Sequence, residues 1–379
     1  MSPLITRTFT VAALAMPLSL SLAPSAQAQS FATEDYKLKV VAVTDGLEHP
    51  WGLAFLPDGM MIVTERDGPV RLIDSDGKKR SPLKGLPEVD DSGQGGMLDV
   101  ALDPNYRTNN LIYLSYAEPG KGGSGTAVAR AKLDVSGNRI DDLQVIFQQL
   151  PKSGGGRHYG SRLVFADDGN LFITTGDRGE RDRVQDFSIN RGQIIRIHSD
   201  GSIPDDNPFV GRAGYRPEVW SYGHRNPQGA SLNPLSRQLW TVEHGARGGD
   251  EVNNPQAGKN YGWPVIAYGK HYFGGSIGEG NKKDGMEQPL FYWDPSIAPS
   301  GMDFYSGDKF PKWKNNLFVA ALKYELVSRL VLEGDKVVRE ERILDGFDER
   351  IRHVRQGPDG YLYLLTDDGD GRILRIEPQ

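Results

Sequence analysis

The chain of 379 residues contains no cysteine. Disulfides, thiolate metal ligands and cysteine nucleophiles are therefore excluded, and stability must come from the burial and pairing of side chains. After the N-terminal segment, the sequence has no apolar run of the roughly 20 residues that a membrane-spanning helix needs, and it has no extended helical periodicity. A formal net charge of −6 argues against nucleic acid or an anionic membrane as the main partner.

The first 28 residues have the pattern of a secretory signal peptide. Arg7 supplies a short positive region, an apolar stretch follows from Val11 to Leu22, and Ala26-Gln27-Ala28 is a small-x-small cleavage pattern. A membrane anchor is the weaker interpretation because the apolar stretch is short and interrupted by prolines. We therefore expect cleavage after Ala28 and a periplasmic or secreted protein without membrane insertion. Loss of Arg7 changes the formal charge from −6 to −7.

One pattern recurs six times in the mature chain: an apolar run, a polar turn and a second apolar run. Turns such as Pro-Asp-Gly and Asp-Asp-Gly between β-branched and aromatic residues predict β-hairpins. The copies begin at Leu53, Val100, Leu163, Ala230, Met302 and Val354. Starts about 50 to 70 residues apart leave room for four strands per copy, which is the repeat of a propeller blade. The sequence thus predicts an all-β, six-bladed β-propeller as one domain over residues 29–379.

Later strands of some blades are also recognisable. GPVRLID from Gly68, GQIIRIHSDG from Gly192 and GRILRIEP from Gly371 read as third or fourth strands. A strand over residues 36–44 would complete the last blade and close the ring, which removes open sheet edges. A pair of β-sandwiches is the alternative, since many-stranded all-β chains also have regularly spaced turns.

Between Ser221 and Pro264 the chain combines charged side chains, amides, aromatics and many glycines, in SYGHRNPQG, EHGARGGDE and GKNYGWP. Such a mixture is unsuited to an apolar core and typical of an ordered polar pocket. Arg225 and Asn226 offer a guanidinium and an amide that suit a quinone, a carboxylate or a phosphate. The alternative is that the two side chains only hold their own loop in place.

The same stretch contains oxygen ligands for a metal. The carboxylates of Glu243, Asp250 and Glu251, together with main-chain carbonyls near Gly245 and Ala246, favour calcium over zinc. Solvated loop carboxylates are the alternative.

Two glycine-rich loops lie earlier in the chain. In KSGGGRHYGSRL, His158 is a candidate general base, because a neutral imidazole near pH 7 accepts a proton from a hydroxyl. A solvated loop histidine is the alternative. Asp177, in ITTGDRG, is the nearest group that would orient this ring. Gln94, in DSGQGGML, is a weaker candidate, since a glutamine among glycines usually serves the turn itself.

A third group of candidates is cationic. Arg350 and Arg352 are two residues apart, so on a strand they would share a face and repel each other unless an anion lay between them. With Lys323 in AALKYE, they suggest a pocket for a polycarboxylate. A basic strand edge that deters aggregation is the alternative.

Taken together, these segments resemble the soluble PQQ-dependent sugar dehydrogenases of the glucose/sorbosone dehydrogenase family, closest to its periplasmic aldose sugar dehydrogenase branch. The resemblance covers nearly the whole mature chain. Its motifs, in order, are HPWGLAFLPDG, QGGMLDVALDP, GGRHYGSRLVF, GSIPDDNPF, WSYGHRNPQG, EHGARGGDEVN, GKNYGWP, QPLFYW and GPDGYLYLLTD. It implies a six-bladed propeller that oxidises aldoses to lactones with PQQ and calcium and passes electrons to an unidentified acceptor.

The resemblance also implies a role for each candidate. His158 would be the base, oriented by Asp177, with Arg225 near the reactive quinone oxygens. One calcium would bind the cofactor and the carbonyls of Gly245 and Ala246, and a second would use the Glu251 side chain and the Tyr261 carbonyl. The residues implied as cofactor contacts are Gln94, Arg225, Asn226, Tyr272, Lys323, Arg350 and Arg352.

The sequence departs from the family's glucose dehydrogenases at one informative position. Those enzymes have an acidic, sugar-contacting residue immediately before the catalytic histidine, whereas this chain has Arg157. A broader range of aldoses than glucose is therefore expected, and the region around Asp182 diverges too far for roles to be transferred. Two other functions remain open at this point: a calcium-dependent lactonase, which has no need of the cationic trio, and a non-enzymatic sugar- or protein-binding propeller. The oligomer is expected to be a monomer or a homodimer.

Overall fold

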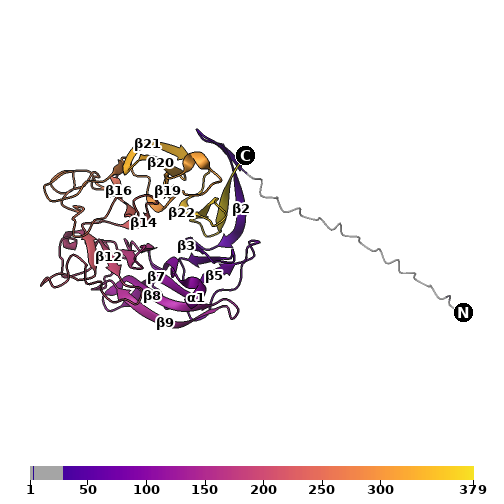
Figure 1. Cartoon of the computed structure of the whole chain (residues 1–379), viewed down its shortest axis with the longest axis horizontal. Helices are drawn as coiled ribbons and strands as arrows, with labels where there is room; N and C mark the ends of the chain where they lie inside the picture. Colours follow the sequence, from indigo (N-terminus) through magenta and orange to yellow (C-terminus); the bar gives the residue numbers. More distant parts are fainter. Residues whose placement is uncertain (1–2, 4–28) are drawn as a thin grey trace.

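The computed structural model describes Pro3 and residues 29–379, so the expected signal peptide lies outside the described residues apart from Pro3. Within residues 29–379, six antiparallel sheets stand in a ring (Figure 1). This arrangement confirms the six-bladed propeller and excludes the pair of sandwiches. In the described part of the chain, no helix combines the length and apolarity that crossing a bilayer requires.

The first three blades follow the chain. They consist of β3 (Pro50–Phe55), β4 (Met61–Glu65) and β5 (Val70–Ile73); β6 (Met97–Leu102), β7 (Leu111–Gly120), β8 (Gly123–Asp134) and β9 (Arg139–Gln148); and β10 (Leu163–Phe165), β11 (Leu171–Thr174), β12 (Gln193–Ile197) and β13 (Val219–Tyr222). Short helices lie in the connections: α1 (Tyr106–Asn109), η1 (Arg181–Arg183) and, in the fifth blade, η2 (Pro311–Trp313).

The last three blades continue in the same order. They consist of β14 (Pro227–Leu232), β15 (Leu239–Glu243), β16 (Asp250–Asn253) and β17 (Phe291–Trp293); β18 (Pro299–Phe304), β19 (Leu317–Ala321), β20 (Val327–Glu333) and β21 (Lys336–Ile343); and β22 (Ile351–Gln356), β23 (Leu362–Thr366), β24 (Gly371–Pro378), β2 (Lys37–Leu47) and β1 (Gln29–Ala32). Each of the six expected hairpins forms the first two strands of a blade.

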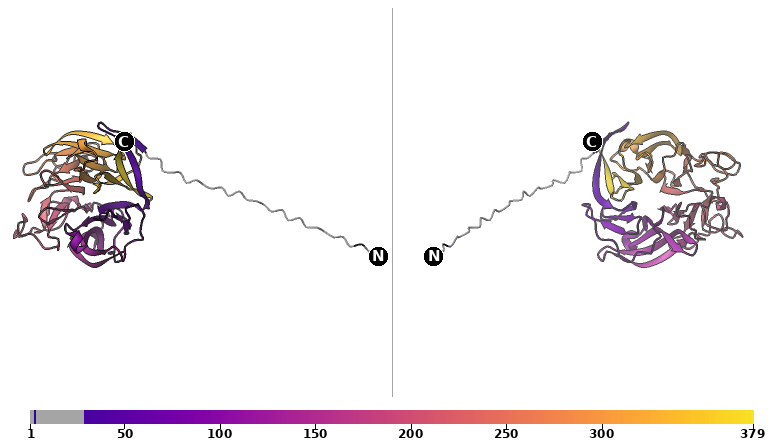
Figure 2. Two further views of the ribbon diagram at one scale, coloured as in Figure 1. Left: turned by 45° about the vertical axis from the view of Figure 1, so that its right-hand side comes forward. Right: turned by 180° about the vertical axis from the view of Figure 1, so that it is seen from behind.

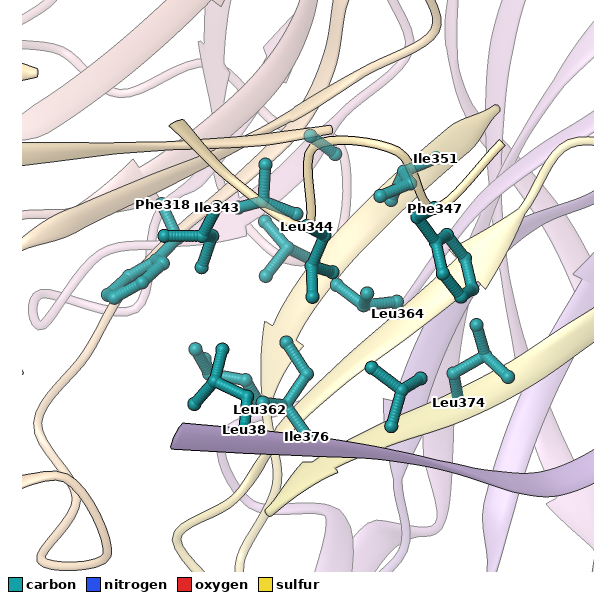
Figure 3. Packing of buried hydrophobic residues seen from close by; sticks show 14 of the residues in the cluster. Leu38, Phe318, Ile343, Leu344, Phe347, Ile351, Leu362, Leu364, Leu374 and Ile376 are labelled. Carbon is teal, nitrogen blue, oxygen red and sulfur yellow. The ribbon is translucent and has the colours of Figure 1, made fainter. Parts of the chain in front are cut away.

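The chain's two ends close the ring as expected. β2 pairs antiparallel with β24, with Val40 opposite Ile376, and the back view in Figure 2 shows the indigo N-terminal strand beside the yellow C-terminal one. Leu38, Leu362 and Ile376 pack together in the sixth blade (Figure 3). Burying such an aliphatic side chain typically contributes about 1.5–3 kcal/mol, so closure is stabilised by packing as well as by strand pairing.

The first blade differs from the expected four strands. Its sheet has three strands in the described chain, because the segment after β5 contains Pro82 and Pro87, which cannot donate backbone hydrogen bonds to a sheet. The segment still pairs irregularly with β5, since Lys79 bridges Ile73 and the Leu83 amide donates to the Val70 carbonyl at 2.8 Å. Lys84 then forms a parallel bridge with Arg139 at the start of β9 in the second blade. The segment therefore joins two blades.

The hairpins also explain where a site can form. The first strands of successive blades contact one another around the axis, from β3 through β22 and back to β3. Since each hairpin is antiparallel, the start of its first strand pairs with the end of its second, as Pro227 does with Glu243. Loops that precede first strands and loops that follow second strands therefore gather on one face of the ring.

Candidate active site

Two adjoining cavities open among these loops. One has a volume of about 780 Å³ and is lined by residues that include Gln94, His158, Asp177 and Arg225. The other, of about 650 Å³, is lined in part by Lys323. Ala246 and Tyr272 line both cavities, so the structure brings candidates from the second to fifth blades into one basin.

His158 and Asp177 form a largely buried pair at the first cavity. Nδ1 of His158 lies 2.6 Å from Oδ1 of Asp177, which leaves Nε2 as the nitrogen that can act as a base. Burial lowers the pKa of His158 below its ordinary value, and the charges of Arg225 and Arg157 add to this, although the bond to Asp177 opposes it. The imidazole is therefore neutral at physiological pH, as a base must be.

The backbone at His158 is held in an unusual conformation. Its φ is 56°, a left-handed value that is uncommon for a non-glycine residue and often found at functional sites. Its amide donates to Oε1 of Gln94 at 2.8 Å, so Gln94 positions the base in addition to lining the cavity. A Cβ on Gly176 would lie 2.1 Å from the His158 carbonyl oxygen; the glycine before Asp177 lets the two segments approach.

Trp263 forms a hydrogen bond to the His158–Asp177 pair. Sequence reasoning did not single out this residue. Its indole Nε1 donates to Oδ2 of Asp177 at 2.9 Å, and its ring lies 5.3 Å from the Arg225 guanidinium carbon. Asp177 thus accepts hydrogen bonds on both carboxylate oxygens. Burial alone would raise the pKa of Asp177, but His158 and Arg225 lower it below the ordinary value, so the carboxylate stays ionised beside the ring.

Arg225 lines the first cavity and is held in place by hydrogen bonds. Its amide donates to Oε2 of Glu243 at 2.6 Å, and Nη1 donates to the His244 carbonyl at 3.2 Å. The buried Nε has no hydrogen-bond partner among the described residues. Asn226 is buried beside it, and its Oδ1 accepts the Gly160 amide at 3.1 Å. The Arg225 side chain therefore keeps a donor available for a ligand.

A small cavity of about 20 Å³ adjoins this arginine. That volume is enough for roughly one water molecule or ion. Its lining includes Glu243, Gly245, Ala246, Glu251 and Tyr261. Burial, together with the neighbouring Glu243 carboxylate, raises the pKa of Glu251 to about 8, because a second negative charge in this cavity is disfavoured unless a cation lies beside it.

Asp250 does not fit the role of a metal ligand. Its Oδ1 accepts the Gly245 amide, and its Oδ2 accepts bonds from Ser296, Ile297 and Ala298. Both oxygens therefore hold the loop together. In residues 29–379, no group of three or more His, Cys, Asp or Glu side chains is arranged around a metal position, so a bound cation would depend mainly on carbonyl oxygens.

The expected cationic trio is arranged differently from the prediction. Arg350 lies just before β22 and not on the strand; its side chain is 50% exposed, whereas that of Arg352 is 8% exposed. The anion between them is the protein's own Asp367, whose Oδ2 lies 3.2 Å from Arg350 Nη2 and 2.8 Å from Arg352 Nη2. Arg350 lines a separate cavity of about 460 Å³, while Lys323 lines the basin.

Comparison with known proteins agrees with this architecture. The family model for glucose/sorbosone dehydrogenases matches residues 47–375. The chain belongs to this family. Aldose sugar dehydrogenase YliI of Escherichia coli (strain K12) is 47% identical over 346 residues, which are 90% of this chain and 93% of that protein.

Solved structures of sugar dehydrogenases also match most of this chain. The apo form of the soluble aldose sugar dehydrogenase from Escherichia coli has a TM-score of 0.88 at 47% identity, covering 90% of this chain and 100% of that one. The PQQ-bound form of aldose sugar dehydrogenase from Streptomyces coelicolor has a TM-score of 0.75 at 30% identity, covering 91% and 99%.

In this family member, then, the sequence-derived candidates are divided among three cavities. The basin is lined by Gln94, His158, Asp177, Arg225, Ala246, Tyr272 and Lys323, the small cavity beside it by Gly245, Glu251 and Tyr261, and a separate cavity by Arg350. Sequence reasoning missed Trp263 and Asp367. A tryptophan among glycines in GKNYGWP was the available signal for the first. Asp367, in the apolar-to-acidic run LLTDD, had no distinguishing pattern.

Proposed function

We propose that this chain is a PQQ-dependent dehydrogenase that oxidises the anomeric carbon of aldose sugars to lactones. The observation that carries this proposal is the His158–Asp177 pair, which shares a cavity of about 780 Å³ with the Arg225 guanidinium. A base and a fixed cation facing one cavity suit the removal of a proton from a substrate whose hydride goes to a quinone. The PQQ-bound relative from Streptomyces coelicolor supports the choice of quinone.

The residues of the basin fit this cofactor. PQQ is a planar ortho-quinone with three carboxylates, and the buried Nε of Arg225 without a partner is the kind of donor that such a group satisfies. Gln94, Arg225, Asn226, Tyr272 and Lys323 would hold it. Arg350 and Arg352 remain further candidates, each already paired with Asp367.

His158, Asp177 and Arg225 each have a separate role in the proposed reaction. Nε2 of His158 takes the proton of the anomeric hydroxyl, and Asp177 stabilises the imidazolium that results. When bound, PQQ supplies the acceptor for the hydride that leaves C1 of the sugar. Loss of this hydride and of the hydroxyl proton leaves the C1 carbonyl of a lactone. Arg225 stabilises negative charge on the quinone oxygen, a contribution of typically about 2.7–4 kcal/mol for one well-placed donor.

Calcium would occupy two places. The carbonyls of Gly245 and Ala246 would bind the ion that contacts the cofactor; both residues line the small cavity, and Ala246 also lines the basin. The small cavity of about 20 Å³ would hold the second ion through the Glu251 carboxylate and the Tyr261 carbonyl. Oxygen donors of this kind are the ligands that calcium prefers.

The proposal also covers the protein's location and its electron acceptor. Cleavage after Ala28 would leave residues 29–379 in the periplasm or outside the cell as a monomer or homodimer. Electrons would then pass to an external acceptor.

Reconstitution tests the function directly. Purified protein loaded with PQQ and calcium should reduce an artificial electron-accepting dye when aldoses are added. His158→Gln should keep PQQ binding, followed by its absorption spectrum, and lose turnover. The matched control is His198→Gln, an exposed histidine on the same blade, which should behave like the parent. Turnover that survives in His158→Gln would remove the base from its role, and lactone hydrolysis without dye reduction would favour a lactonase.

A further inference from the structure

We propose that the preferred aldose carries an anionic group, a carboxylate or a phosphate, and that Arg157 binds this group at the mouth of the cavity. The inference rests on the proposed function, because it concerns the substrate of the same site. Arg157 is exposed, lines the cavity of about 780 Å³ and directly precedes the base His158. A sugar whose anomeric hydroxyl faces His158 therefore lies within the field of this guanidinium.

The carboxylates of the cavity wall are already paired with cationic side chains. Asp177 faces His158, Glu180 pairs with Arg183 and Arg191, and Asp182 pairs with Arg181. Each of these wall carboxylates thus already has a partner.

Arg157 and Arg225, by contrast, have no carboxylate partner among residues 29–379. Arg225 faces the cofactor position in the proposed function, so Arg157 is the wall cation left for the substrate. An exposed guanidinium of this kind is the side chain best suited to bind a carboxylate or phosphate in a bidentate manner.

The fold also keeps Arg157 close to the reacting groups. A Cβ on Gly179 would lie 2.6 Å from Nε of Arg157, so the side chain lies against the backbone of that glycine. The Gly179 amide in turn donates to Oδ1 of Asp177 at 2.7 Å. One glycine thus contacts both the arginine and the orienting carboxylate.

The backbone of Arg157 is anchored as well. Its carbonyl oxygen accepts a hydrogen bond from Nη1 of Arg178, and the Arg178 guanidinium carbon lies 3.4 Å from the centre of the Tyr159 ring. Both Arg178 and Tyr159 are buried. The cation therefore starts from a fixed main chain, which lowers the entropy lost when it binds an anion.

The test compares sugars that differ at one carbon. With the PQQ- and calcium-loaded enzyme at low ionic strength, kcat/KM is measured for glucose, glucuronate and glucose 6-phosphate. We expect at least one of the two anionic sugars to exceed glucose by about tenfold or more, the size of a charge-assisted hydrogen bond. Added salt should reduce this preference, because the arginine is exposed. The better of the two anionic sugars distinguishes a carboxylate from a phosphate.

Variants assign the preference to one side chain. Arg157→Gln should abolish it, and Arg157→Asp should reverse it in favour of glucose. The matched control is Arg107→Gln, which removes an exposed arginine from α1, between β6 and β7 and so on the opposite face of the ring, and should leave the ratio unchanged. A parent enzyme that prefers glucose, or an Arg157→Gln variant that loses activity equally on all three sugars, would overturn the inference.

Failure of the proposed function is recognisable separately. If no sugar reduces the dye although PQQ is bound, the dehydrogenase proposal fails. Calorimetric titration of the same loaded protein with glucuronate and glucose 6-phosphate then decides about Arg157. Binding that Arg157→Gln weakens about tenfold supports the anion site, and equal or absent binding in both proteins refutes it.

Discussion

Replacing Trp263 with phenylalanine would remove one hydrogen bond from the catalytic pair and keep an aromatic ring in place. The indole Nε1 donates to Oδ2 of Asp177 at 2.9 Å, and this atom pair is buried. A hydrogen bond to a charged group contributes about 1.5–3 kcal/mol, so the variant's free energy of unfolding should fall by about that amount. The variant should also shift the pH dependence of catalysis, and the direction of this shift can be predicted.

The acid limb of the pH profile should move to higher pH. In the parent protein the pKa of His158 lies below its ordinary value, mainly because of burial. Activity is lost only as the pH falls through this lowered pKa, since the protonated ring cannot act as a base. Without the indole hydrogen bond, the negative charge of the Asp177 carboxylate is less stabilised by its surroundings. The carboxylate therefore stabilises the His158 imidazolium more strongly. The pKa of His158 therefore rises, and activity is lost sooner on acidification.

The assay is kcat/KM of the reconstituted enzyme between about pH 5 and 8, where histidine titrates, at constant ionic strength. Trp220→Phe is the control, because its indole also donates over 2.9 Å, to the Pro255 carbonyl, away from the pair. It should lose stability without moving the acid limb. A Trp263→Phe variant that is less stable but has the parent's acid limb would show that Trp263 only packs, and the reasoning about Asp177 would be refuted.

Two further predictions concern charge. In Glu251→Gln, the rise in melting temperature on adding calcium should shrink, because a ligand at about 100 times its Kd stabilises the folded state by about 2.7 kcal/mol; an unchanged calcium shift in thermal unfolding would exclude Glu251 as a ligand. In Asp367→Asn, Arg350 and Arg352 lose their shared carboxylate, and the free energy of unfolding should fall by about 3–5 kcal/mol at neutral pH. Although burial opposes it, Arg352 and His49 hold the pKa of Asp367 well below its ordinary value, so the stabilisation is present above about pH 3.9 and is lost progressively as the pH falls below it. Denaturant curves of parent and variant should therefore converge in acid, and a constant difference would contradict this role.

The blades were predictable because their information is local. Turn residues such as those at Asp58 and Gly59 set each hairpin, and alternating apolar residues set its buried face. The exceptions are places where a proline or a distant partner interrupts the pattern. The segment after β5 pairs with that strand only irregularly, and Lys84 bridges to Arg139 in the next blade. Arg350 likewise lies outside its expected strand, and the anion that it shares with Arg352 is Asp367 of the protein itself.

The sequence by itself determined the hairpin repeat and the kinds of side chain available for chemistry: a histidine, several guanidiniums and loop carboxylates among glycines. Only the tertiary structure decided which of them meet. Gln94 reaches His158 across 64 residues of sequence, and Trp263 reaches Asp177 across 86. Asp367 neutralises Arg350 and Arg352, whereas Arg157 keeps no carboxylate partner within residues 29–379. The physical reason is that hydrogen bonds and ion pairs require atoms to lie within a few ångströms of each other. The closed ring of blades determines these distances between remote segments, and the local sequence pattern does not.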